Sequence, residues 1–206
     1  MFVGHLAFAF LLPVVLPGSF AALLLCCQLS DILFFTLVLG NVEHMRLVPG
    51  FTATNDMDLY YMPFSHSLLG AAVLALVVYL VTRRVSYALA TLSHWLGDLP
   101  FHVADLTLAG GSVKYGFGLW QHKWVALGLE TVLFVLCAAA FAKSAPRSDR
   151  RALTFVFWIC LVLHTLNWLQ LVPVRSVREL GIQALLTYFA IPLIAFWLSR
   201  PQQKAK

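Results

Sequence analysis

Long runs of apolar residues, separated by short polar segments, dominate the chain from its first residues onward. Each run approaches the ~20 apolar residues that an α-helix needs to cross a bilayer. The runs are apolar on all sides of a helix, and lipid is the environment that solvates such a surface. We predict an all-α, polytopic transmembrane helix bundle of six to seven spans, the first of them short. The predicted spans lie at roughly 3–16, 19–40, 64–82, 86–104, 121–142, 152–172 and 178–199.

Composition excludes a soluble globular domain. Hydrophobic residues make up 61% of the 206 residues and charged residues only 11%, against about 25% charged in typical globular domains. We therefore expect a single integral membrane domain over residues 1–206. The four cysteines lie inside apolar runs without the spacing of a metal or disulfide motif, which indicates small buried hydrophobic side chains. They are Cys26, Cys27, Cys137 and Cys160.

The net charge of +5 does not indicate a nucleic-acid partner, because the basic residues form short clusters between apolar runs. Nine of the fourteen basic residues fall on one side of the predicted membrane: Arg83, Arg84, Lys143, Arg147, Arg150, Arg151, Arg200, Lys204 and Lys206. The positive-inside rule makes that side cytoplasmic. The connections 41–63 and 105–120 then face outward. With seven spans the N-terminus is outside and the C-terminus inside; if the first segment does not cross, the N-terminus moves inside.

Ionisable side chains occur within the apolar runs, where they are costly. An Asp at the centre of a span costs about 2.5 kcal/mol or more on insertion scales, so such residues indicate a functional site. Two of them, His94 and Asp98, are four residues apart and share one helix face. Imidazole and carboxylate are suitable ligands for Zn2+, Mn2+ or Fe2+. An internal hydrogen bond between the two is the alternative interpretation.

The predicted topology places five of these side chains at a similar depth in the outer half of the membrane. We expect them to meet in one outward-opening cavity and to bind a divalent metal, Zn2+ first, as one or two ions. These predicted ligands are His5, Asp31, His66, His94 and Asp98, with His102, Asp105 and Glu130 as further candidates. Residues 1–120 contain the site motifs, and residues 121–206 form a looser helical portion.

Several dispersed motifs, in order along the chain, resemble the bacterial inner-membrane-associated metal-dependent hydrolases. The motifs are Phe2-Val-Gly-His5, Gln28-Leu-Ser-Asp31, Val48-Pro-Gly, Pro63-Phe-Ser-His-Ser67, Ser93-His-Trp-Leu-Gly-Asp98, His102 with Asp105, and Gly116-Phe-Gly-Leu-Trp120. The resemblance implies a location in the bacterial inner membrane. It extends distantly to zinc-dependent phospholipase C and P1-type nucleases, and it implies that the five predicted ligands match ligands of those enzymes.

Two departures from those enzymes argue against a three-metal cluster. Their later His-x3-Glu motif is absent, because His122 is followed by Ala126. Their amino-terminal Trp ligand is replaced by Met1-Phe2. The Gly-rich loop that contains Gly110-Gly111 and Gly116-Phe-Gly118 is predicted to be a flexible loop tip rather than a phosphate cradle, since no strand or Walker spacing precedes it.

Three functions remain open from the sequence. The first is hydrolysis of a phosphoester in a membrane lipid or lipid-linked substrate, with Asp31 or Asp98 holding metal or orienting water and His102 as general acid. The second is a cation- or proton-coupled transporter or permease using the same cluster. The third is a metal-stabilised membrane scaffold without turnover. Protein partners are left open.

Overall fold

The structure is a computed structural model and describes residues 3–200. Phe2 of the first motif, and Lys204 and Lys206 of the basic cluster, lie outside the described residues. The described part of the chain is 66% helix, as the apolar runs predict. The eight α-helices of the described part are α1 (Val3–Val15), α2 (Phe20–Cys27), α3 (Leu29–Leu39), α4 (Leu68–Thr82), α5 (Val85–Phe101), α6 (Lys123–Ser144), α7 (Arg150–Trp168) and α8 (Val177–Leu198).

The helical class is confirmed, and the two long polar connections each contain a small antiparallel sheet that the sequence did not predict. The first consists of β1 (His44–Leu47) and β2 (Met57–Tyr61), the second of β3 (Leu106–Thr107) and β4 (Lys114–Tyr115). A short 3-10 helix, η1 (Leu119–Gln121), follows. In the first sheet Arg46 lies opposite Asp58, and their side chains form an ion pair with a 2.6 Å separation. Opposite charges on facing strand positions stabilise such a pairing.

A bundle of six to seven spans is not supported. In residues 3–200 three helices are long and apolar enough to cross a membrane, namely α6, α7 and α8. The run predicted at 64–82 starts with a turn, so that α4 has only 15 residues and rises about 22 Å, short of the roughly 30 Å of hydrocarbon. The run at 3–16 yields a helix of 13 residues. The apolar runs extend beyond the ends of the helices into irregular backbone. The sequence therefore overestimated the number of helices long enough to span a membrane.

The run predicted at 19–40 is divided between two helices. Helices α2 and α3 meet at Gln28 and are bent by 47°, so that together they form either a fourth, broken span or a re-entrant segment. Gln28 is buried at the break. The bend brings the first turn of α3, which contains Asp31, into the interior of the protein.

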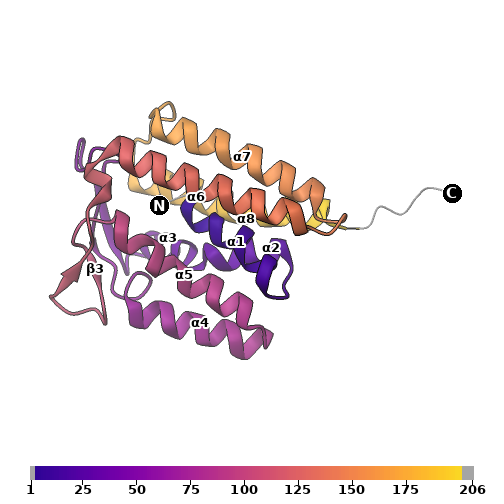
Figure 1. Cartoon of the computed structure of the whole chain (residues 1–206). Coiled ribbons are helices and arrows are strands. Elements are labelled where there is room, and N and C mark those ends of the chain that lie inside the picture. Colours follow the sequence, from indigo (N-terminus) through magenta and orange to yellow (C-terminus); the bar gives the residue numbers. More distant parts are fainter. Residues whose placement is uncertain (1–2, 201–206) are drawn as a thin grey trace.

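Helices α6, α7 and α8 form one group and α4 and α5 another, with α1 and α2 between them (Figure 1). Helices α6, α7 and α8 run side by side, α4 packs against α5, and α1 packs against α2, α5 and α6. Aromatic side chains fill the centre: the Phe10 ring of α1 lies 5.1 Å from that of Phe20 and 5.2 Å from that of Phe134. Helix α1 is thus a buried central helix, with two groups of longer elements around it.

The three long helices leave apolar surface uncovered. Only 22% of the most apolar window of α8 and 33% of those of α6 and α7 are buried inside the protein. Large side chains such as Leu136 and Leu193 are more than 60% exposed. Apolar surface of this extent indicates contact with lipid, which supports a membrane protein.

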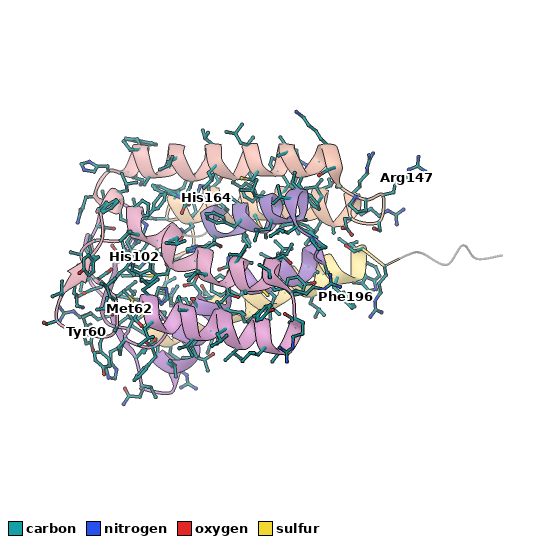
Figure 2. All side chains as sticks on the ribbon, turned by 60° about the horizontal axis from the view of Figure 1, so that its bottom comes forward. Tyr60, Met62, His102, Arg147, His164 and Phe196 are labelled. Carbon is teal, nitrogen blue, oxygen red and sulfur yellow. The ribbon has the colours of Figure 1, made fainter. Side chains whose placement is uncertain are left out.

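The two ends of the bundle differ in composition. The sheets and long connections gather at one end, where Figure 2 labels Tyr60, Met62 and His102. Arg147 and Phe196 are labelled at the opposite end, beside the α6–α7 loop and the end of α8. We call the first the hairpin end and the second the basic end.

Candidate metal centre

Helix α5 supplies the middle of the site. His94 and Asp98 lie one turn apart, and His102 caps the C-terminus of the helix. All three are at most 2% exposed. Asp98 lies between the two imidazoles, with its Oδ2 3.2 Å from His94 Nε2 and its Oδ1 3.4 Å from His102 Nε2. The four-residue spacing therefore produces the shared face that the sequence predicted.

The break between α2 and α3 contributes an acid and an acceptor to the site. Carbonyl groups in the last turn of a helix lack partners within that helix, and the Cys27 carbonyl at the end of α2 lies 2.8 Å from His94 Nδ1. In the first turn of α3, the Asp31 Oδ1 atom lies 3.5 Å from His94 Nε2. The two ring nitrogens of His94 thus face opposite sides of the same helix break.

Helix α1 contributes His5. Its Nε2 atom lies 3.0 Å from Asp98 Oδ1. Its ring stacks on that of His94, with 3.6 Å between centroids and an interplanar angle of 10°. His5 is 1% exposed, so the central position of α1 in the fold places this imidazole in the interior.

His66 comes from the turn that precedes α4. Its Nε2 atom lies 3.5 Å from Asp31 Oδ1 and 3.7 Å from Asp98 Oδ2. The adjacent Ser67 caps α4 by accepting a hydrogen bond from the Gly70 N–H. An additional Cβ at Gly70 would lie 1.9 Å from the Phe64 carbonyl oxygen, so glycine is required for this turn to pack against the helix.

The structure thus brings together all five predicted ligands, from α1, α3, α5 and the turn before α4. Within the described residues two groups of three could hold a metal ion, and their ligand atoms lie within 4.8 Å of one another. One group is His5, His94 and Asp98; the other is Asp31, His66 and His94. The convergence is confirmed, while the binding of a metal stays a prediction.

The spacing of the donor atoms fits one small cation. Two ligands about 2.1 Å from zinc at a tetrahedral angle lie about 3.4 Å apart. The separations of His66 and His94 Nε2 from Asp31 Oδ1 are both 3.5 Å. His94 Nε2 is buried and makes no hydrogen bond to any described residue. Two buried carboxylates also need compensating positive charge, which a dication supplies.

The orientation of three imidazoles fits metal binding as well. Metal-bound histidines commonly donate their other ring N–H to a carbonyl or carboxylate, directly or through a polar group. The Nδ1 atom of His94 faces the Cys27 carbonyl, that of His66 lies 2.9 Å from the Ser65 hydroxyl, and that of His102 lies 2.8 Å from Asp105 Oδ1. In each ring Nε2 is left to face Asp31 or Asp98.

Part of the Gly-rich loop has a defined structural role, while its flexibility stays a prediction. Gly116 adopts φ +153°, and a Cβ there would lie 2.0 Å from the Val103 carbonyl oxygen and 2.5 Å from that of His102. The Gly118 N–H donates to the His102 carbonyl. The His102 ring lies 4.1 Å from that of Trp120. These glycines allow the loop to close over the backbone at His102.

Glu130 belongs to neither of the two described groups of three that could hold a metal ion, so its place among the candidate ligands stays a prediction. It lies on α6, and its Oε2 is 3.4 Å from His164 Nδ1 on α7. Asp105 also takes an indirect place, since it contacts His102 rather than the group itself. The sequence alone could not show which of these residues contact the group, because no sequence spacing relates a residue of the last three helices to the residues of α5.

Two contributions were missed by the sequence reasoning. Glu43, in the loop before β1, is fully buried and contacts Ser65 beside His66. Tyr188 of α8 interacts with Asp31 through a side-chain hydrogen bond, so residues 121–206 also reach the site. The Ser65-His66-Ser67 motif was the available signal for the contact with Glu43. No local sequence feature indicated the contact of Tyr188.

Asp31 is the most accessible of the predicted ligands. Its side chain is 14% exposed, against 3% or less for the side chains of His66, His94 and Asp98.

No family model, curated protein or solved structure matches the chain. The resemblance to membrane-associated metal-dependent hydrolases accordingly stays a prediction.

Proposed function

We propose that the protein is a membrane-embedded, metal-dependent hydrolase of a phosphoester in a lipid or lipid-linked substrate. The observation that carries the proposal is the convergence of four imidazole Nε2 atoms on the Asp31 and Asp98 carboxylates inside a protein with lipid-facing helices. Ionisable groups are costly in such a setting and persist where they serve a function. We assign one or two divalent ions, Zn2+ first, because mixed imidazole and carboxylate ligands suit it.

A bound divalent cation would polarise the phosphoryl oxygens and lower the pKa of a bound water. The chain would bind it through His5, His66, His94 and the two aspartates. Asp31, as the accessible carboxylate, is placed to orient an incoming water or phosphoryl group. The water oxygen would bond to phosphorus, the phosphorus–oxygen ester bond would break, and the released alkoxide would need a proton.

His102 is the residue we assign as the source of that proton. Its Nδ1 is held by Asp105 and its Nε2 faces Asp98, so a proton at Nε2 points toward the cluster. A carboxylate on the far nitrogen stabilises the protonated imidazole and holds its orientation. Such a general acid contributes a factor of about 10² to 10⁴ in rate.

We place the hairpin end on the extracytoplasmic side of a bacterial inner membrane. The basic end carries Arg147 at the α6–α7 loop, and the positive-inside rule favours a cytoplasmic position for it. Exposed aromatic side chains at the hairpin end, including Tyr60, Phe64 and Phe117, have the amphipathic or apolar character found at headgroup depth. A site at that depth favours a lipid phosphoester over a soluble substrate.

Metal content and hydrolysis, measured on the same purified samples, test the proposal. We expect wild-type protein in detergent to retain about one to two divalent ions and to hydrolyse bis(p-nitrophenyl) phosphate or phosphatidylcholine in mixed micelles. His94→Ala should lose both properties, whereas Glu130→Gln, at the polar pair outside the site, should keep both. A wild-type protein without bound metal, after zinc has been supplied during growth, would contradict the proposal.

Transport of a cation or protons is the rival function, and one observation favours it. The Glu130–His164 pair is a second buried acid–imidazole contact, located between two helices long enough to span the membrane. Reconstituted vesicles loaded with a pH-sensitive or zinc-sensitive dye distinguish the two functions. Hydrolysis without flux supports the enzyme, and flux abolished by Glu130→Gln supports the transporter.

A further inference from the structure

Glu43 is a buried carboxylate outside the helices, and its contacts concentrate on one short turn. Its Oε1 atom accepts hydrogen bonds from the backbone N–H groups of Phe64 and Ser65, at 2.8 and 2.9 Å. Its Oε2 atom accepts a hydrogen bond from the Ser65 hydroxyl. The side chain is 0% exposed. A carboxylate buried so completely, 21 to 22 residues away from its partners, is costly unless its hydrogen bonds offset the loss of water.

The proton of the Ser65 hydroxyl determines the next contact. A hydroxyl has one proton, and here it is donated to Glu43. Ser65 Oγ must therefore accept at its second contact, the 2.9 Å approach of His66 Nδ1. His66 then carries its ring proton on Nδ1. The Nε2 lone pair of the neutral imidazole is left to face Asp31 Oδ1 and Asp98 Oδ2.

We propose that Glu43 is a positioning residue for the metal centre: through Ser65 it fixes the tautomer and the ring orientation of His66. The inference rests on the proposed metal site and names two residues, Glu43 and Ser65, on which its affinity depends. The same logic operates through a shorter connection at His94, where the acceptor is the Cys27 carbonyl.

The Glu43–Ser65–His66 chain also connects the metal centre to the hairpin end. Glu43 directly precedes β1, and His66 directly follows the turn after β2. The loop that enters the first sheet and the turn that leaves it are therefore held together by one carboxylate. Removing that carboxylate should make the His66 ring less well ordered, although His66 itself is unchanged.

The experiment compares Zn2+ affinity, by competition with a chelating dye, and the visible spectrum of the Co2+-loaded protein. Glu43→Gln keeps an oxygen for the two backbone N–H groups, but its amide donates toward Ser65. The serine proton must then turn to His66 Nδ1, which moves the ring proton to Nε2, where metal would bind. We expect Zn2+ affinity to fall 10- to 100-fold, as for other residues that orient metal ligands, and the Co2+ spectrum to change.

Ser65 provides the second pair of variants. Ser65→Ala preserves the backbone contacts of Glu43 and should weaken Zn2+ binding by a similar factor, whereas Ser65→Thr, which restores the hydroxyl, should recover most of it. The double variant Glu43→Gln/Ser65→Ala should bind Zn2+ as tightly as the weaker-binding single variant. The two losses should not add, because the residues act as one unit. Glu130→Gln is the matched control, a buried glutamate that contacts a histidine outside the site.

The outcomes separate this inference from the proposed function. If wild-type protein binds Zn2+ and His94→Ala does not, but Glu43→Gln and Ser65→Ala bind like the wild type, the positioning role is refuted and the metal site stands. A simple structural role is refuted in turn if Ser65→Ala unfolds at the wild-type temperature yet binds Zn2+ weakly. If wild-type protein binds no metal, both proposals fall.

Discussion

At the scale of single residues, Asp98 is the side chain on which the site depends most. Each of its two oxygens faces two imidazoles: Oδ1 lies 3.0 and 3.4 Å from His5 and His102, and Oδ2 lies 3.2 and 3.7 Å from His94 and His66. Asp98 thus lies beside four imidazoles, whereas Asp31 lies beside two, those of His66 and His94. A carboxylate in this position can bind one ion or bridge two.

Asp98→Asn tests the importance of its negative charge. The amide has nearly the same volume and retains one acceptor oxygen, but it cannot offset the charge of a dication in a low-dielectric interior. We expect normal insertion and expression, at least a tenfold loss of metal affinity, and loss of hydrolysis. Metal analysis and activity of the detergent-purified protein measure the change. Equal loss in Glu130→Gln would show that any buried charge, rather than this site, controls metal content.

Much of this residue-level chemistry was predictable, and the limits have physical reasons. The i, i+4 relation of His94 and Asp98 follows from helix geometry, and the polarity of His5, Asp31 and His66 stands out against apolar runs. Glu43 could not be recognised in this way, because it lies in a loop where charged residues are normally solvated. Its role depends on the sheet that brings it to the turn at Ser65.

At the scale of elements, the helices were located accurately but their ends and breaks were not. Apolar runs predicted each helix to within a few residues, yet the run at 19–40 contains a 47° break and the run at 64–82 begins with a turn. Hydropathy does not distinguish helix from buried irregular backbone. The candidate site uses both the α2–α3 break and the turn before α4. At such irregular backbone, carbonyl groups and side chains are available to contact the histidines of the site.

Gly70→Ala tests the packing of the turn against α4. The added methyl carbon would lie 1.9 Å from the Phe64 carbonyl oxygen, so the 64–67 turn must move and carry Ser65 and His66 with it. We expect unfolding at a lower temperature, by an amount equivalent to roughly 1–3 kcal/mol, together with weaker metal binding. Thermal unfolding and dye competition on one sample measure the two effects.

Gly128→Ala is the control for that substitution. Gly128 lies inside α6, and a Cβ there would meet nothing within 4 Å. Alanine favours a helix interior over glycine by up to about 1 kcal/mol, so this variant should unfold at the same or a higher temperature and bind metal like the wild type. Identical behaviour of the two variants would mean that the turn at Phe64 does not constrain the site.

At the scale of the whole molecule, the bundle has two chemically different ends and a lipid-facing side. The candidate metal centre lies toward the hairpin end, where Figure 2 labels His102, and the aromatic cluster around Phe10 fills the interior nearer α6. Helices α6 and α8, and the shorter α4, present many exposed large apolar side chains to the surroundings. Only Ala71 and Ala75 of α4 are buried, whereas α1 and α5 bury much of their length among neighbouring helices; composition alone could not separate these two environments.

Chemical labelling tests which end of the bundle faces the cytoplasm. Ser148, in the α6–α7 loop at the basic end, and Ser112, between β3 and β4, are both exposed, so a cysteine at either position can react. The clusters of Arg and Lys at the basic end should hold it in the cytoplasm. In intact cells an impermeant maleimide should label Ser112→Cys and leave Ser148→Cys unlabelled until the cells are lysed. The native cysteines are all buried, so the unsubstituted protein should give little background. Labelling of Ser148→Cys from outside would reverse the assignment, and the metal centre would then open toward the cytoplasm and its substrates.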